Sequence, residues 1–217
     1  RVVLRRAGVA SVARRLGAAS WVSKNDPGTT VDGIDSNADN APSCVIDDGE
    51  THFGIGSTTI KIGLDGRFSV ERRILFVCTG NTCRSPMAET IARSLIEKQG
   101  PTGITTIVES AGIATDDGHS ASADAVSVMN ERGLDLSGHR SRMLTAEMID
   151  RAEVVYTMTH MHAQRAMSVA PDAVHKVFPL SEVGVVGDPI GQSIDVYRKT
   201  ADQLEELINK RLQEIAP

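Results

Sequence analysis

Residues 73–217 predict an α/β fold, an open parallel sheet of four strands with helices on both faces. Two observations lead to this expectation. Apolar strands alternate with helical patterns along this part of the chain, and parallel strands need crossover helices between them. The last helical pattern has one broad apolar stripe opposite a charged face, as expected of a helix that covers a sheet.

The first predicted strand is the apolar run from Ile74 to Cys78. Further strands are predicted at 106–109, 154–158 and 176–178, and helices at 86–99, 121–132, 145–151, 160–168 and 192–215. Ligands of open parallel sheets bind beyond the carboxyl ends of the strands. The loop after Cys78 is therefore the first place to look for a functional site.

Residues 1–43 differ in composition from the rest of the chain. An Arg-rich, acid-free stretch is followed by a run of Asp, Asn, Gly, Pro and Ser, and we expect a poorly structured or fragmentary segment. The first stretch has the composition of an organellar transit peptide, but an amphipathic helix cut from a larger protein is the favoured interpretation. Because the chain begins with Arg1, we expect a fragment or a processed product.

Residues 44–72 predict a short β element with a hairpin turn at Asp65-Gly66. Its part "VIDDGETHFGIGSTTIKI" resembles the closing strands of the YrdC-like threonylcarbamoyl-AMP synthase domain, without the upstream substrate-binding motifs of that family. The resemblance implies that 45–72 is the remnant of a fused domain.

The net charge of −5 lies in the second part of the chain. Residues 1–72 hold nine basic and nine acidic side chains, whereas 73–217 hold 14 and 19. An acidic domain gains no electrostatic help in binding nucleic acid, and we expect no nucleic-acid partner. A small, locally basic anion pocket remains compatible with this balance.

The three cysteines, Cys44, Cys78 and Cys83, are too few and odd in number for a disulfide framework, and they suit a reducing cytosol. A tetrahedral zinc site is not expected, because no second cysteine pair follows and the nearest downstream histidine is His119. No run of eighteen apolar residues is present. We therefore expect a soluble, cytoplasmic protein without metal, organic cofactor or membrane contact, and a monomer.

The string "ILFVCTGNTCRSPMAE" joins the first strand to an amphipathic helix with Pro86 at its first position. Gly80 allows a positive φ and Asn81 tolerates one, so that backbone amides of Thr79 to Cys83 can form an anion nest. The helix dipole adds to it.

Within this loop Cys78 is the candidate nucleophile. The nest, the helix N-terminus and Arg84 should lower the pKa of its thiol. The Cys-x5-Arg spacing supplies an attacking sulfur and a bidentate guanidinium for a phosphoryl group from one loop. Ser85 can donate a hydrogen bond to the sulfur when a phosphocysteine intermediate is hydrolysed. An ordinary buried thiol is the alternative.

Residues 73–217 resemble the low-molecular-weight protein tyrosine phosphatases, and among them the bacterial protein arginine phosphatases most closely. Besides "CTGNTCRSP", the segments "ESAGI", "LSGHRSRMLT", "VVYTMTHMH" and "GDPIGQSIDVYRKT" match landmarks of that family in order. The resemblance implies a flavodoxin-like fold of the phosphotyrosine protein phosphatase I type. It also implies a phosphorylated protein as the substrate.

The proton donor is expected at Asp188-Pro189, which matches the acid motif of the family. The loop after the last strand lies at the same sheet edge as Cys78. Asp188 is therefore the predicted general acid for phosphotransfer and the general base for water in the second step. Asp26-Pro27 is more simply a turn.

Two residues bear on the substrate. The resemblance implies threonine at the position of Thr82 in arginine phosphatases and a bulkier aliphatic residue in tyrosine phosphatases. A hydroxyl there could hydrogen-bond a guanidinium-linked phosphate. Ile190 stands where both subgroups usually carry an aromatic residue, which weakens stacking on that wall. Phosphotyrosine and phosphoarginine both remain open.

Cys83 could form a reversible disulfide with Cys78, as the resemblance implies, or be a small packed thiol. The histidines are given no catalytic role: His139 lies in a family landmark and can orient the loop, and His160 and His162 begin a helix where polar caps are expected.

Two other functions are suggested by parts of the sequence. An arsenate reductase shares this fold and loop, but it needs a downstream resolving cysteine, and none follows Cys83. An RNA-modification module, acting through the YrdC-like remnant, is opposed by the acidic charge and the incomplete synthase domain.

Overall fold

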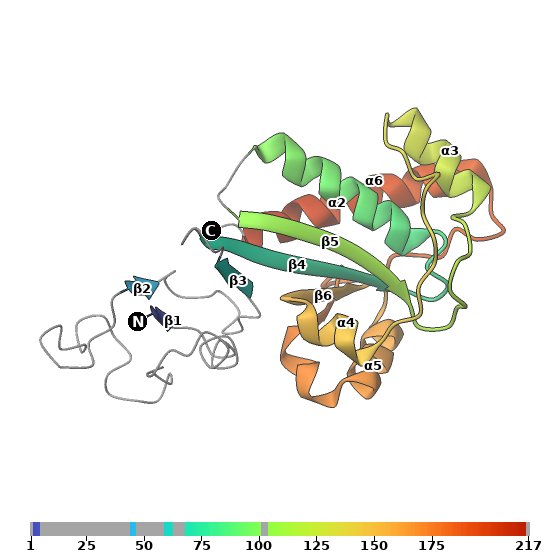
Figure 1. Cartoon of the computed structure of the whole chain (residues 1–217). Coiled ribbons are helices and arrows are strands. Elements are labelled where there is room, and N and C mark those ends of the chain that lie inside the picture. The colour runs from blue at the N-terminus through green and yellow to red at the C-terminus, as the bar shows by residue number, and fades with distance from the viewer. Residues whose placement is uncertain (1, 5–43, 47–58, 63–67, 101–103, 216–217) are drawn as a thin grey trace, which may run out of the picture. The chain divides into compact units, whose positions relative to one another are not determined.

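The computed structural model describes residues 2–4, 44–46, 59–62, 68–100 and 104–215 of the chain, drawn in Figure 1. The chain divides into two compact units, Arg1–Val70 and Glu71–Pro217. In the first unit, β1 (Val2–Leu4) pairs in parallel with β2 (Cys44–Ile46). Val2–Leu4 is thus a strand and not part of the helix expected there. The rest of that helix and the Asp65-Gly66 turn lie outside the described residues.

The sheet of the second unit contains the four predicted strands. They are β4 (Phe68–Cys78), β5 (Ile104–Gly112), β6 (Val154–Thr157) and β7 (Val177–Pro179). β6 is parallel to both β4 and β7, with Ile74 opposite Val154. β5 pairs with β4 and runs in the same direction in Figure 1. The expected four-stranded parallel sheet is confirmed. A further strand, β3 (Thr59–Ile62), belongs to the first unit.

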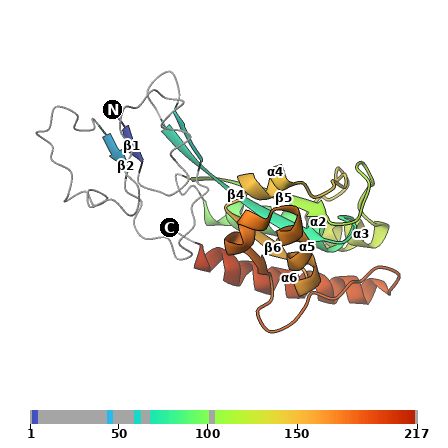
Figure 2. The same cartoon turned by 90° about the horizontal axis from the view of Figure 1, so that it is seen from below.

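Helices cover both faces of this sheet (Figures 1 and 2). They are α2 (Arg84–Gln99), α3 (Ala123–Glu131), α4 (Ala146–Arg151), α5 (His160–Val169) and α6 (Ile194–Glu214), with a 3-10 helix, η2 (Pro171–Lys176), before β7. In Figure 1, α2, α3 and α6 lie on one side of the sheet and α4 and α5 on the other.

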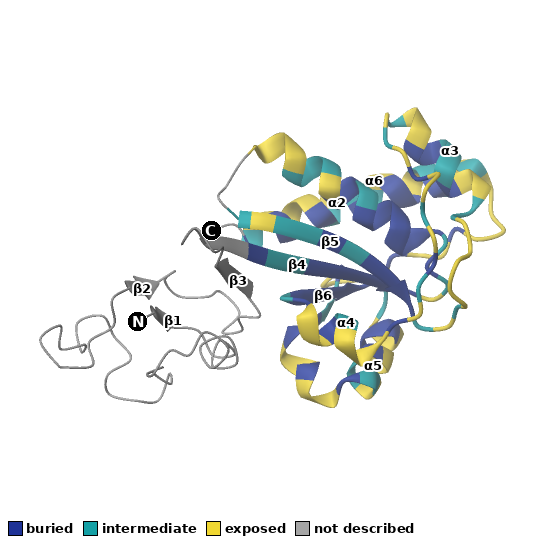
Figure 3. Cartoon of the chain, viewed as in Figure 1, coloured by how far each residue is buried: buried dark blue, intermediate teal, exposed yellow. Residues whose placement is uncertain are grey.

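Alternation along β4 divides the core between these two layers. Ile74, Phe76 and Cys78 belong to the cluster that includes residues of α2 and α6, whereas Leu75 and Val77 belong to the cluster on the side of α4 and α5. Successive side chains of a strand point to opposite faces. Figure 3 shows β4 and β6 as buried along most of their described length. The strand that ends in Cys78 is therefore held from both sides.

Several predicted boundaries are shifted. α2 begins at Arg84, so Pro86 is its third residue and not its first. A proline is tolerated there because the amides of the first turn have no intrahelical acceptor. β5 is longer than 106–109, and Lys176 belongs to η2 and not to the last strand.

No helix among the described residues is both long and apolar enough to cross a membrane.

Candidate active site

The loop between β4 and α2 carries the predicted nucleophile, anion nest and arginine. Cys78 is the last residue of β4 and is 2% exposed. Asn81 adopts the positive φ, 52°, that the turn requires, and Gly80 does not. Asparagine tolerates this conformation better than other residues with a side chain. The sequence therefore predicted the turn, but assigned the special conformation to two residues when one adopts it.

Asn81 connects this loop to three other segments. Its side-chain amide donates to Ser85 Oγ and to Ser110 Oγ, each at 2.9 Å, and its Oδ1 accepts from the backbone amide of Arg142 at 2.9 Å. His139 Nε2 lies 2.7 Å from its carbonyl oxygen. The side chain is fully buried, and its oxygen and nitrogen are all hydrogen-bonded, as buried polar groups usually are. The loop is thus fixed before any substrate arrives.

Gly112, at the end of β5, allows the loop to approach the sheet. A Cβ atom on this residue would lie 2.6 Å from the carbonyl oxygen of Thr79 and 3.1 Å from the amide nitrogen of Asn81. The amide of the next residue, Ile113, donates to the Cys78 carbonyl at 3.0 Å. Only glycine leaves room for backbone so close to backbone.

The sulfur of Cys78 is surrounded by hydrogen-bond donors. Ser85 Oγ lies 3.0 Å from Sγ, and the Asn81 amide donates to Sγ at 3.3 Å. Burial raises the pKa of the thiol above its ordinary value, while Ser85, the charge of Arg84 and the Asn81 amide lower it by less. The lowered pKa expected from the sequence is wrong for this arrangement. The donors were predicted correctly, but the sequence does not show how completely the sulfur is buried.

The guanidinium of Arg84 is 4% exposed and is held on two sides. Nη1 donates to the carbonyl oxygen of Val186 at 3.2 Å, and Nη2 donates to Thr79 Oγ1 at 3.3 Å. Nη2 also donates to Asp188 Oδ2. Nε is buried and has no hydrogen-bond partner among the residues that the structure describes. A buried N–H without a partner is rare and costs about 1–3 kcal/mol, so this atom is available to a bound acceptor.

Asp188 reaches the loop from the segment between β7 and α6, as predicted. Its side chain is 41% exposed, and Oδ2 pairs with Arg84 while Oδ1 accepts from the Ile190 amide at 3.3 Å. This carboxylate can turn to solvent, but the buried guanidinium that it leaves then needs another anion, because an unpaired buried charge is strongly destabilising. The candidate nucleophile, the cation and the candidate acid thus meet at the carboxyl edge of the sheet.

The remaining predicted residues are Thr82 and Cys83 in the loop and Ile190 after Asp188. The Thr82 carbonyl accepts from the Ser122 amide at 2.9 Å. Cys83 Sγ lies 3.3 Å from Ser122 Oγ and 3.5 Å from Tyr197 Oη, so it contacts the side of α3 and α6. Ile190 is 61% exposed.

His162 is the residue that sequence reasoning missed. The cap of α5 is Thr159, whose Oγ1 accepts from the His162 amide at 3.3 Å, so the histidine is not the cap. Its imidazole instead points to the loop, where Nε2 lies 2.9 Å from Thr79 Oγ1. Burial, and then the charge of Arg84, lower the pKa of His162 to about 4. No short-range pattern in the sequence connects positions 79 and 162.

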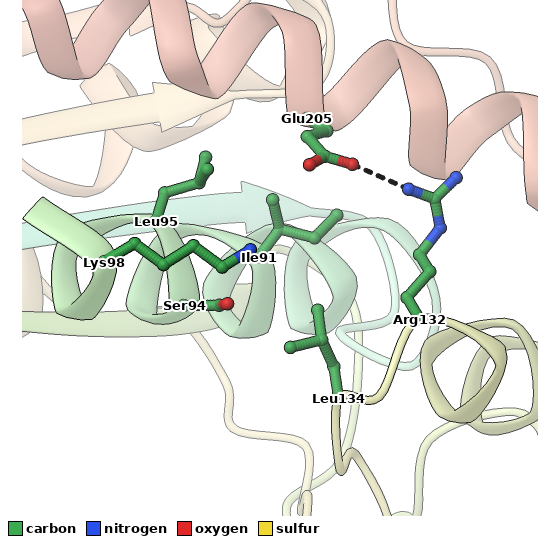
Figure 4. A pocket seen from close by; sticks show the side chains of 7 residues that line it. All are labelled: Ile91, Ser94, Leu95, Lys98, Arg132, Leu134 and Glu205. Atoms are coloured by element: carbon green, nitrogen blue, oxygen red, sulfur yellow. Dashed lines mark hydrogen bonds and ion pairs between the residues drawn. The ribbon is translucent and has the colours of Figure 1, made fainter.

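Two surface hollows lie outside this set. One, of about 280 Å³, lies between α2, α6 and the segment after α3, and the ion pair of Arg132 with Glu205 at 2.7 Å borders it (Figure 4). A larger one, of about 500 Å³, is bordered by His139 and Arg142, the two residues that hydrogen-bond the carbonyl and side-chain oxygens of Asn81. Neither contains Cys78. Among the described residues, no group of three or more His, Cys, Asp or Glu side chains is arranged to hold a metal ion.

Comparisons with known proteins agree on one family. Residues 73–217 match the family model described as low molecular weight phosphotyrosine protein phosphatase. The chain is 41% identical over 147 residues to a protein-arginine-phosphatase of Bacillus subtilis, covering 65% of this chain and 95% of the relative. It is 38% identical to the low molecular weight protein-tyrosine-phosphatase PtpB of Staphylococcus haemolyticus, over 64% of this chain and 96% of the relative.

A solved structure extends the comparison to the site. It is a mutant of the YwlE arginine phosphatase with a phosphorylated active-site serine. It is 41% identical, with a TM-score of 0.61, and the match covers 65% of this chain and 95% of the other.

Proposed function

The chain belongs to the low molecular weight phosphotyrosine protein phosphatase family, and we propose that it dephosphorylates proteins through Cys78, Arg84 and Asp188, with phosphoarginine as the preferred substrate. Membership of this family makes it a cysteine-dependent protein phosphatase. The proposal concerns the roles of these residues and the choice between phosphoarginine and phosphotyrosine.

The observation that carries the proposal is the Nε of Arg84, which has no partner within the described part of the chain. It belongs to a buried guanidinium in the same loop as Cys78, and Asp188 holds the adjacent Nη2. A phosphoryl group bound to Nε and Nη2 would satisfy the first atom and take the place of Asp188 at the second. Displacement would free the carboxyl group at the time when a leaving group needs a proton.

The reaction then proceeds in two balanced steps. In the first, the Asp188 carboxylate released from Arg84 takes up the proton of the Cys78 thiol, the resulting thiolate attacks phosphorus, the bond from phosphorus to the arginine nitrogen or tyrosine oxygen breaks, and Asp188 gives that proton to the leaving atom. In the second, water attacks phosphorus, Asp188 takes a proton from it, and the sulfur–phosphorus bond breaks. Ser85 donates to the departing sulfur, for which its position 3.0 Å away is suitable. The phosphorylated active-site serine of the solved relative supports a phosphoenzyme intermediate.

Substrate choice rests on Thr82, Ile190 and Asp188. The exposed Ile190 offers no aromatic face to a phosphotyrosine ring. A phosphoarginine guanidinium carries positive charge, which the neighbouring carboxylate of Asp188 favours. Thr82 leaves room for this group beside the loop. The arginine phosphatase of Bacillus subtilis is among the similar relatives, and phosphotyrosine is the second candidate because tyrosine phosphatases match nearly as well.

Parallel kinetics test both parts. Cys78→Ser should abolish hydrolysis of an aryl phosphate, and near-wild-type turnover would refute the mechanism. The ratio of kcat/KM for phosphoarginine and phosphotyrosine peptides should exceed one in the wild type and fall about ten-fold or more in Thr82→Ile. If the replacement leaves the ratio unchanged, Thr82 is not the selector.

The proposal extends to the setting of the enzyme. A free, buried nucleophilic thiol is compatible with a reducing compartment, so we place the enzyme in the cytoplasm. A monomer is also part of the proposal. A reversible Cys78–Cys83 disulfide and a fused-domain remnant at 45–72 stay part of this proposal.

A further inference from the structure

Both ring nitrogens of His162 lie within hydrogen-bond distance of a threonine hydroxyl. The place of His162 in α5 does not by itself require these contacts. The imidazole is 3% exposed. Nδ1 lies 2.7 Å from Thr159 Oγ1, and Nε2 lies 2.9 Å from Thr79 Oγ1. Thr159 is the cap of the same helix, whereas Thr79 directly follows the nucleophile. The imidazole therefore connects a fixed helix end to the catalytic loop.

Thr79 Oγ1 is the next member of this chain of contacts, because it accepts from Arg84 Nη2 at 3.3 Å. Three acceptors hold the two terminal nitrogens of Arg84: Thr79 Oγ1, the Val186 carbonyl and Asp188. In the proposed reaction Asp188 must leave to serve as the acid. The Val186 carbonyl and the Thr79 hydroxyl then remain as the neutral contacts that orient the guanidinium.

A neutral imidazole is suited to hold Thr79 in this way, since it offers one donor and one acceptor. The Thr79 oxygen accepts from Arg84 and keeps one proton. Either Thr79 donates that proton to Nε2, with Nδ1–H donating to Thr159, or Nε2–H donates to Thr79. In both arrangements the two ring nitrogens and the hydroxyl groups of Thr79 and Thr159 each take part in a hydrogen bond. A charged imidazole would place a second cation close to Arg84, and the pKa of about 4 keeps it neutral at physiological pH.

We infer that His162 is a positioning residue, which acts through Thr79 to keep the Arg84 guanidinium aligned with the phosphoryl group when Asp188 moves to the leaving group. It touches neither substrate nor reacting atoms. The inference rests on the proposed function, since it gives His162 a part in that reaction. A guanidinium that holds a phosphoryl group must be placed accurately. A displacement of about 1 Å lowers the rate about 10²-fold.

Two replacements of His162 separate its two contacts. His162→Gln can place an amide near the Nε2 position and keep the contact with Thr79, whereas His162→Asn reaches only the Nδ1 position and keeps the contact with Thr159. We expect His162→Asn to lower kcat for an aryl phosphate about 10- to 100-fold with a much smaller change in KM. His162→Gln should recover most of this loss. The exposed His160, two residues earlier on α5, gives the control His160→Asn, which should change neither value.

A binding measurement reports the same effect without turnover. Orthovanadate imitates the five-coordinate transition state, and inorganic phosphate the product. Misaligned Arg84 should weaken orthovanadate inhibition more than phosphate inhibition in His162→Asn. Equal weakening of both, or equal losses in the Asn and Gln variants, would overturn the inference in favour of a purely structural role.

Replacing Thr79 decides whether His162 acts through it. In a Thr79→Val background, His162→Asn should cost less than about two-fold, because the contact is already lost. An undiminished effect would overturn the inference. If His162→Asn does not fold, Thr79→Val against Thr79→Ser tests the same contact, and equal kcat values would overturn it. Activity that survives Cys78→Ser would instead refute the proposed function.

Discussion

Asp188 is paired with Arg84, the residue that is proposed to bind the phosphoryl group. The guanidinium is buried and the carboxyl side chain is 41% exposed, so Asp188 is the partner that can move. The candidate acid therefore occupies the edge of the guanidinium that a phosphoryl oxygen would use. Phosphoryl binding and release of the acid are coupled by this competition.

Removing the charge of Asp188 should have opposite effects on binding and turnover. In Asp188→Asn, inorganic phosphate no longer competes with a carboxylate for Arg84, and its inhibition constant should fall. Turnover of an aryl phosphate should fall by about 10²- to 10⁴-fold, because no acid remains for the leaving group. Steady-state kinetics with phosphate as inhibitor measure both. Asp195→Asn, at the exposed first turn of α6, is the control and should change neither; weaker phosphate binding in Asp188→Asn would contradict the competition.

Removing the hydroxyl of Ser85 should raise the pKa of Cys78 further. The Ser85 hydrogen bond lowers that pKa, while burial raises it. In Ser85→Ala less thiolate is present at a given pH, and alkylation of Cys78 by iodoacetamide should slow. Peptide mass spectrometry across a pH series separates Cys78 from Cys83 and Cys44. Ser94→Ala, on the same helix, is the matched control, and an unchanged alkylation profile in Ser85→Ala would argue against this role of the hydroxyl.

A methyl group at Gly112 should disturb the loop without touching the nucleophile. Its Cβ would lie 2.6 Å from the Thr79 carbonyl oxygen, a backbone atom that cannot rotate away. We expect Gly112→Ala to lower the free energy of unfolding by about 1–3 kcal/mol and to reduce activity. Gly138→Ala is the control, because a Cβ there meets nothing within 4 Å and φ is not positive. Urea denaturation compares the two; equal stabilities would mean that the loop shifts at no cost.

Acidification should destabilise the protein through His162. The pKa of its imidazole falls from 6.5 to about 4 on folding, chiefly through burial. Between these values the unfolded chain binds the proton and the folded protein does not, so stability falls as pH falls from about 6.5 to about 4. The melting temperature of His162→Gln should drop less over this range than that of the wild type. A parallel drop in both proteins would show that other groups, such as His139, whose pKa burial also lowers, dominate.

The fold could be predicted well because it depends on local patterns. Strand Ile74 to Cys78 and helix α2 are visible as an apolar run followed by a helical stripe, and the structure has both. The errors lie at the ends of elements. Lys176 was placed in a strand, yet its ammonium donates to the carbonyl oxygens of Asp150 and Ala152, contacts that hold η2 rather than extend β7. Such contacts join residues more than twenty positions apart and leave no periodic signal.

The candidate site could be predicted where its members share one loop or one motif. Cys78, Arg84 and Ser85 are within eight residues of each other, and the Asp188-Pro189 pair stands out by type and place. Gly112 is visible in the sequence only as part of the landmark "ESAGI". That this position requires glycine follows from the close approach of β5 to the loop. His162 was interpreted as a helix cap, since the sequence shows that it begins a helix but not where its ring points.

The sequence by itself determined the chemical groups of the candidate site: a thiol, a guanidinium and a carboxyl group at one edge of a parallel sheet. The tertiary structure alone decided their state. It buries the Cys78 sulfur so that its pKa is raised, pairs Asp188 with Arg84, and holds Arg84 through Thr79 and His162. The physical reason is that residue types follow from the sequence, whereas desolvation and hydrogen bonding depend on neighbours that folding brings together from distant positions.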